Sequence, residues 1–191
     1  MPVVLRNCEF GRLASPALLD QVRYVSCRRI GGHLPGPVRS TAATWSGDKP
    51  VPQLTMSVPA DATICSGDII SIRLVAHYAA QPFAGHIRIT AMGTEILLLL
   101  LSPATDQEID IDLTMSFAGN AFAQPDRFSV SGPVRVNNTM AATTKHPGGS
   151  VDRRTPLTVD LAAWIDKPVA SPAGIEVRTA RIAFREVEGD G

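Results

Sequence analysis

The chain has 191 residues, of which 45% are hydrophobic and 19% charged, so it can bury enough apolar surface to fold and is not a disordered polymer. Its length fits one domain of ordinary size. Because 18 basic residues balance 18 acidic residues, no overall charge draws the protein to nucleic acid or to an anionic membrane. The longest apolar run, Ile96–Leu101, is far shorter than the roughly 20 residues of a membrane-spanning helix.

The cysteines and the first residues bear on the cellular compartment. Cys8, Cys27 and Cys65 have no CxxC spacing and no histidine in metal-ligand register, so we expect free thiols. The first residues lack the basic segment and apolar core of a secretory signal, which predicts synthesis in a reducing cytoplasm.

The first third of the chain shows few signals of regular structure. A helical turn is expected at 15–20, followed by a first strand at 22–30. Glycine and proline recur from Gly31 to Pro59, and this composition predicts an extended, polyproline-like excursion with one edge strand at Leu54–Val58. Such an excursion would wrap the surface of the domain or reach a neighbouring subunit.

The clearest strands follow in the middle of the chain. Apolar and polar residues alternate over 68–78, 86–92 and 108–117, which predicts half-buried strands. The segment Glu95–Leu101 ends in an uninterrupted apolar run. We therefore expect a central strand, covered on both faces by a loop or by a partner.

The last strands are expected to be irregular. The strand predicted at 128–136 contains Gly132 followed by proline, a typical bulge or edge device. Alternation returns at 157–161. In the final strand, 175–187, the apolar phase changes sides, which predicts a bulge near Thr179.

Many short strands with Pro and Gly turns, and no long stretch with a helical period, predict an all-β fold. We expect a β-sandwich, specifically a jelly roll, as a single domain over 1–191 with the extended segment 31–59.

No pattern in the sequence predicts catalysis. Nucleophile, phosphate-loop and zinc motifs are missing, and the four histidines lie on different expected elements. The spacing of Asp110 and Asp112, with Glu108, permits a catalytic or calcium role. Acidic residues that alternate with isoleucine are also typical of a solvated sheet face, and we favour that interpretation. We expect a protein that is not an enzyme and that binds no cofactor or metal.

Trp45 and two arginine doublets are the candidates for ligand or interface contacts. Trp45 would serve as a stacking platform for a sugar or, the favoured alternative, as the anchor of an extended arm in an apolar pocket. The doublets are Arg28 with Arg29 and Arg153 with Arg154. Because they lack surrounding lysines and aromatic residues, ion pairs between subunits are favoured over contacts with nucleic acid.

The segment 31–59, the strand Leu113–Phe117 and the closing strand 175–184 resemble phage virion structural proteins, in particular small jelly-roll head-decoration, spike or tail-associated subunits. The resemblance lies in the general character of the sequence over the whole chain and not in a signature motif, so no functional residue is carried over. It implies a non-enzymatic subunit of a phage or virus-like particle, located in the virion. The partners implied are copies of the chain and other virion proteins, with neither direct nucleic acid contact nor a membrane.

Two alternatives remain open. One is a carbohydrate- or receptor-binding β-sandwich module that takes a surface glycan. The other is an enzyme that uses Asp110 and Asp112 or a pair of histidines.

Overall fold

The computed structural model describes residues 3–6, 9–10, 22–25, 28–29, 35–59, 64, 67–118, 127–141, 148–151, 155–167 and 173–185. These residues form strands and connecting turns, without a helix among them. The predicted all-β fold is confirmed. Within the same residues, a helix with the length and apolar character to cross a membrane is not found.

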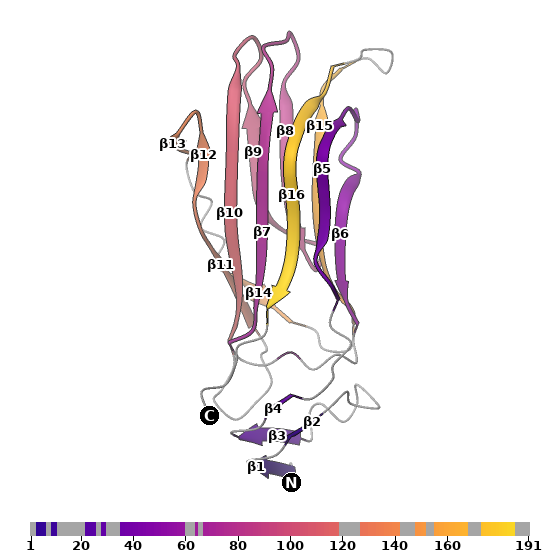
Figure 1. The fold of residues 1–191 in the computed structure, drawn as a ribbon, viewed down its shortest axis with the longest axis vertical. Coiled ribbons are helices and arrows are strands. Elements are labelled where there is room, and N and C mark those ends of the chain that lie inside the picture. The colour runs from indigo at the N-terminus through magenta and orange to yellow at the C-terminus, as the bar shows by residue number, and fades with distance from the viewer. Residues whose placement is uncertain are drawn as a thin grey trace.

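Eight strands form two antiparallel sheets that pack face to face (Figure 1). In chain order they are β5 (Val38–Trp45), β6 (Pro52–Val58), β7 (Ile69–Tyr78), β8 (Gly85–Ala91), β9 (Thr94–Leu101), β10 (Gln107–Ala118), β15 (Leu157–Ile165) and β16 (Ile175–Arg185). The larger sheet contains the order β10-β7-β16-β5, and the smaller sheet is β6-β15-β8-β9. Numbered one to eight along the chain, these orders are 6-3-8-1 and 2-7-4-5. This is the connectivity of two Greek keys in a jelly roll, so the predicted jelly-roll β-sandwich is confirmed.

The remaining strands extend or accompany the sandwich. The larger sheet continues beyond β10 through β11 (Arg127–Ser131), β12 (Val134–Val136), β13 (Thr139–Met140) and β14 (Gly149–Ser150). Two parallel two-stranded sheets, drawn below the sandwich in Figure 1, consist of β1 (Val3–Arg6), β2 (Glu9–Phe10), β3 (Val22–Val25) and β4 (Arg28–Arg29). The strand predicted at 22–30 is present in part as β3 and β4, whereas the helical turn predicted at 15–20 lies outside the described residues.

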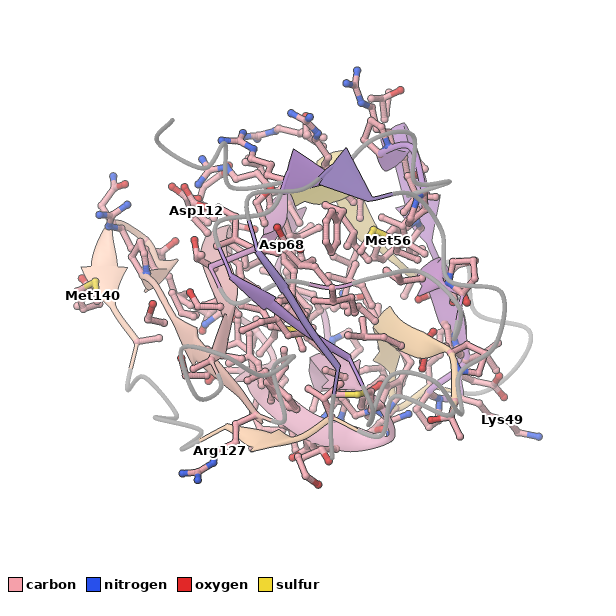
Figure 2. All side chains as sticks on the ribbon, turned by 90° about the horizontal axis from the view of Figure 1, so that it is seen from below. Lys49, Met56, Asp68, Asp112, Arg127 and Met140 are labelled. Atoms are coloured by element: carbon pink, nitrogen blue, oxygen red, sulfur yellow. The ribbon has the colours of Figure 1, made fainter. Side chains whose placement is uncertain are left out.

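Strict alternation builds the core between the two sheets. On β7, every second residue from Ile70 to Tyr78 is fully buried, and on β10 the inward residues are isoleucine, leucine, methionine and phenylalanine. Each fully buried isoleucine, leucine, methionine or phenylalanine side chain stabilises the fold by about 1.5–3 kcal/mol because its apolar surface is removed from water. Figure 2 shows Met56 of β6 inside the outline of the molecule, while Lys49 projects from its edge. The strands predicted at 68–78, 86–92 and 108–117 are confirmed within about one residue at each end.

The extended excursion predicted over 31–59 is wrong where the structure describes it, because residues 38–45 and 52–58 are β5 and β6. Both are edge strands of their sheets. Proline, which has no N–H to donate, is tolerated in edge strands and at strand ends. The alternation of β5 is hard to recognise because small side chains such as Ser40 and Ala43 occupy inward positions. The edge strand predicted at Leu54–Val58 is confirmed within β6.

The apolar run Ile96–Leu101 belongs to an edge strand, and the prediction of a central strand was wrong. Among the described strands, β9 pairs with β8 alone. Leu97 and Leu101 are buried, but Leu98 is 39% exposed and Leu100 is 65% exposed. The outer face of this strand is therefore apolar and open to solvent in the single chain.

Both predicted bulges are present. Gly132, at φ +137°, separates β11 from β12, and these two strands pair with successive parts of β10. In β16 the register shifts between Val177 and Thr179, so that Arg178 is the additional residue. The bulge returns the following apolar residues to the core and directs Arg178 outward, where it binds both carboxylate oxygens of Glu108 at 2.7 and 2.8 Å.

Tyr78 closes the turn between β7 and β8. Its ring is buried against Gly85, where an added Cβ would lie 2.7 Å from the ring, and its hydroxyl donates to the Phe83 carbonyl. Burial is the largest effect on the Tyr78 pKa and, with the charge of Asp166, raises it above 10.0, while the side chain of Gln81 lowers it. The phenol therefore stays protonated near neutral pH and keeps donating to the carbonyl.

Candidate functional site

Trp45 is part of the core. It is 6% exposed at the end of β5, directly opposite Ile175 of β16. Its ring therefore offers no surface to a sugar, and the pocket that it fills lies within its own sandwich and not on a neighbouring subunit. This corrects the prediction that Trp45 is a ligand or interface anchor.

Of the two arginine doublets, the structure describes only the first. Arg28 and Arg29 form β4, whose backbone pairs with β2. Arg153 and Arg154 lie outside the described residues. The structure therefore brings none of the predicted contact residues together into one site within its described part.

The acidic residues of β10 lie on the outer face of the larger sheet among arginines. Arg73 Nη1 lies 2.6 Å from Asp110 Oδ1 and 3.3 Å from Asp112 Oδ2, and Arg135 approaches Asp110 at 3.7 Å. Figure 2 shows Asp112 at the outside of the molecule. No cluster of three metal-ligating side chains occurs in the described part of the chain. The arrangement fits the solvated, ion-paired sheet face that the alternation favours, in which each pair contributes about 0–1 kcal/mol.

The outer face of the smaller sheet is different because it combines apolar, aromatic and cationic side chains. Leu100 of β9, His86 of β8 and Trp164 of β15 are cross-strand neighbours in one line, and Leu98 lies opposite Arg88 in the next line. The His86 ring stacks on Trp164 with centroids 4.7 Å apart and an interplanar angle of 6°. The Arg88 guanidinium lies 5.5 Å from the centroid of the same indole. We call these five residues the β8–β9 face.

Hydrogen bonds hold the polar members of the β8–β9 face in place. His86 Nε2 lies 2.8 Å from Asp166 Oδ2, and Arg88 donates to the Pro50 carbonyl at 3.1 Å. Next to Pro50, Val51 is 60% exposed. Four large apolar side chains are exposed in the described residues. Leu98 and Leu100 belong to this face and Val51 borders it, whereas Met140 lies on β13. Tryptophan and arginine are enriched at protein interfaces, and exposed apolar side chains gathered around them mark such a surface.

The sequence contains a signal for this face that the prediction did not use. Apolar alternation over 157–161, continued to 165, places Trp164 on the polar side of its strand. An aromatic residue out of phase with the core is a candidate surface contact. Its proximity to Leu100 and His86 depends on the pairing of β15, β8 and β9, which no single strand sequence specifies.

Comparison with known proteins adds little beyond the fold. The chain matches no protein-family model and no curated protein sequence. Its structure is similar to the crystal structure of Caenorhabditis elegans galectin LEC-6, with 13% sequence identity, a TM-score of 0.29, and coverage of 76% of this chain and 95% of the galectin chain. At this distance the similarity carries no ligand and no residue role over to this protein.

Proposed function

We propose that the protein is a non-enzymatic structural subunit that assembles with copies of itself through the β8–β9 face and the free edge of β9. The observation that carries this proposal is the exposure of Leu98 and Leu100 on an edge strand. An edge strand presents unpaired N–H and C=O groups that accept a strand from another chain. Jelly rolls build viral capsids as well as lectins, and a phage or virus-like particle is the setting that we propose for the assembly.

The sequence of β9 suits pairing with itself. Natural edge strands are protected by lysine, proline or bulges, but from Leu97 to Leu101 the strand carries none of these. Its one charge, Glu95, lies near one end. In an antiparallel pair related by a two-fold axis, the two Glu95 side chains lie at opposite ends and do not repel each other.

Replacing Leu100 with lysine tests the assembly. We expect the wild-type chain to sediment as an oligomer and Leu100→Lys to raise the dissociation constant by about 100-fold, because each of two copies loses about 1–2 kcal/mol of apolar burial and gains a charge. Analytical ultracentrifugation over a range of concentrations measures this change. Leu100 is 65% exposed, so the variant is expected to fold, and circular dichroism checks that it does.

Met140→Lys is the matched control, since Met140 is 55% exposed but lies on β13. Figure 2 shows Met140 on the opposite side of the molecule from Lys49, which precedes the Pro50–Val51 segment at the β8–β9 face. This control should leave the dissociation constant unchanged. A wild-type chain that stays monomeric at every concentration would refute the proposal, as would equal loss of association in both variants.

A second candidate function is carbohydrate or receptor binding at the same face, and the Trp164 arrangement favours it. The indole is partly exposed and is fixed by His86, while Arg88 and Asp166 provide charged hydrogen-bonding groups beside it. Sugars pack their C–H groups on aromatic rings and bond their hydroxyls to such polar groups.

The second candidate predicts that neutral oligosaccharides bind and that Trp164→Ala abolishes the binding. Isothermal titration against a panel of oligosaccharides measures it. Leu100→Lys serves as the comparison, because it disrupts the proposed self-association but leaves the Trp164 ring intact. Equal affinity of wild type and Trp164→Ala for every sugar that binds would contradict this function.

A further inference from the structure

Three arginines form one cross-strand row on the outer face of the larger sheet. Arg181 of β16 lies directly opposite Arg73 of β7 on one side and Arg39 of β5 on the other. Side chains in directly opposed positions have Cβ atoms about 4.5–5.5 Å apart, and like charges at this distance repel. Negative charge nearby would relieve this repulsion.

The described part of the chain supplies that charge to Arg73 alone, through Asp110 and Asp112. Neither Arg39 nor Arg181 makes an ion pair or a side-chain hydrogen bond there. Arg181 is half-buried. Its Nε atom is inaccessible to solvent and has no hydrogen-bond partner in the described structure. A partly desolvated cation that lacks an acceptor is unfavourable, so this end of the row is suited to an external anion.

Two threonines complete the arrangement. Thr179 and Thr41 are directly opposite each other on the same two strands, two residues from the arginines and on the same outer face. Hydroxyl groups both donate and accept hydrogen bonds, and the guanidinium group binds planar or tetrahedral oxyanions through two parallel N–H donors. We propose that Arg39 and Arg181 bind the sulfate or carboxylate group of an acidic saccharide, with Thr41 and Thr179 bonded to hydroxyls of the sugar.

The surroundings favour an isolated negative group over a densely charged polymer. Glu108, Asp110 and Asp112 line β10 on the same face, and Glu176 lies on β16 itself. These carboxylates repel a chain that carries a charge at every repeat, as nucleic acids do. The outward residues of β10, β7, β16 and β5 in the described structure include no Phe, Tyr or Trp on which a base could stack. A saccharide with one acidic group among hydroxyls fits both features.

This site is independent of the functions proposed above, because it lies on the larger sheet and the β8–β9 face lies on the smaller sheet. Loss of self-association in Leu100→Lys should leave it intact. A failure of one proposal therefore has no bearing on the other.

The test is titration calorimetry of the full chain with three probes: a sulfated disaccharide, a uronic acid disaccharide and a neutral disaccharide. We expect one or both acidic probes to bind, and the comparison between them identifies the preferred group. Arg39→Ala and Arg181→Gln should each weaken binding by about tenfold or more, since each removes a charge-assisted pair of hydrogen bonds. Arg181→Lys, which keeps the charge but loses the planar donors, should also weaken it.

Arg185→Ala is the matched control. It removes the same charge from the same strand at an exposed position opposite Ile69, and it should keep affinity within about twofold. Thermal unfolding without ligand adds a second readout: Arg181→Gln should not lower the melting temperature, because it relieves repulsion in the row. A lower melting temperature would indicate a structural role and overturn the proposal.

Four further results would overturn it. These are binding of the neutral probe to the Trp164→Ala variant as tight as that of the acidic ones, equal loss of affinity in Arg185→Ala, no binding of any probe at millimolar concentration, and tighter binding of single-stranded DNA or of an acidic peptide than of either acidic disaccharide.

Discussion

Gly132→Ala is expected to lower the free energy of unfolding by about 3 kcal/mol or more, because it combines a forbidden backbone angle with a steric overlap. Gly132 has φ +137°, which side-chain-bearing L residues rarely adopt, and an added Cβ would lie 2.0 Å from the backbone oxygen of Asp112. That oxygen belongs to the central part of β10 and cannot move without breaking the pairing of β10 with β12. The midpoint of thermal unfolding should fall by about 6–12 °C.

Two other glycines separate the contributions to this loss. Gly93 has φ +74° but open space around its Cα, so Gly93→Ala should cost only the backbone strain, about 1 kcal/mol. Gly36 has neither a positive φ nor a neighbour within 4 Å, so Gly36→Ala should leave stability unchanged or slightly increased. Urea unfolding of the three variants measures the series. Equal stability of Gly132→Ala and Gly36→Ala would show that the bulge at Gly132 is not formed as described.

Ile111→Ala should be the more destabilising of two substitutions at adjacent positions, with a loss of about 3–4 kcal/mol in the free energy of unfolding. Ile111 is fully buried opposite Leu74, so its truncation leaves a cavity between the sheets. Chemical unfolding measured by intrinsic fluorescence gives the value.

Asp112→Ala is the control for the alternation itself. Its side chain is 53% exposed and its ion pair with Arg73 spans 3.3 Å, so stability should change by no more than about 1 kcal/mol. If both variants lose the same amount, the assignment of inward and outward faces on β10 is incorrect.

Alternation was sufficient to predict the strands whose inward residues are large. From Ile70 to Tyr78 and from Ile109 to Phe117 the pattern is unbroken, and the phase change between Val177 and Ala180 located the bulge of β16. The strand β5 escaped prediction because small inward side chains such as Ser40 weaken the contrast on which the pattern depends. Whether a strand is central or at an edge depends on its neighbours, so the apolar sequence of β9 could not decide it.

The candidate sites were less predictable than the fold because each joins residues far apart in the sequence. The stacking of His86 on Trp164 depends on the pairing of β8 with β15. The arginine row depends on two registers that align Arg39, Arg73 and Arg181. A change of one residue in either register would turn one of these side chains to the opposite face. The sequence indicated Trp45, an aromatic residue in a Gly/Pro-rich segment, but its burial serves the core.

The position of β16 in the larger sheet has a consequence for the order in which the protein can fold during synthesis. This strand lies between β5 and β7 and hydrogen-bonds to both, yet the ribosome produces it about a hundred residues after β7. Until then β5 lacks the one strand that it pairs with in the described structure, and β7 has an open edge. These are conditions under which nascent chains associate wrongly. Completion of the sheet therefore waits for a late, sequence-distant insertion, and such non-local pairing makes folding slow relative to a helical protein of the same length.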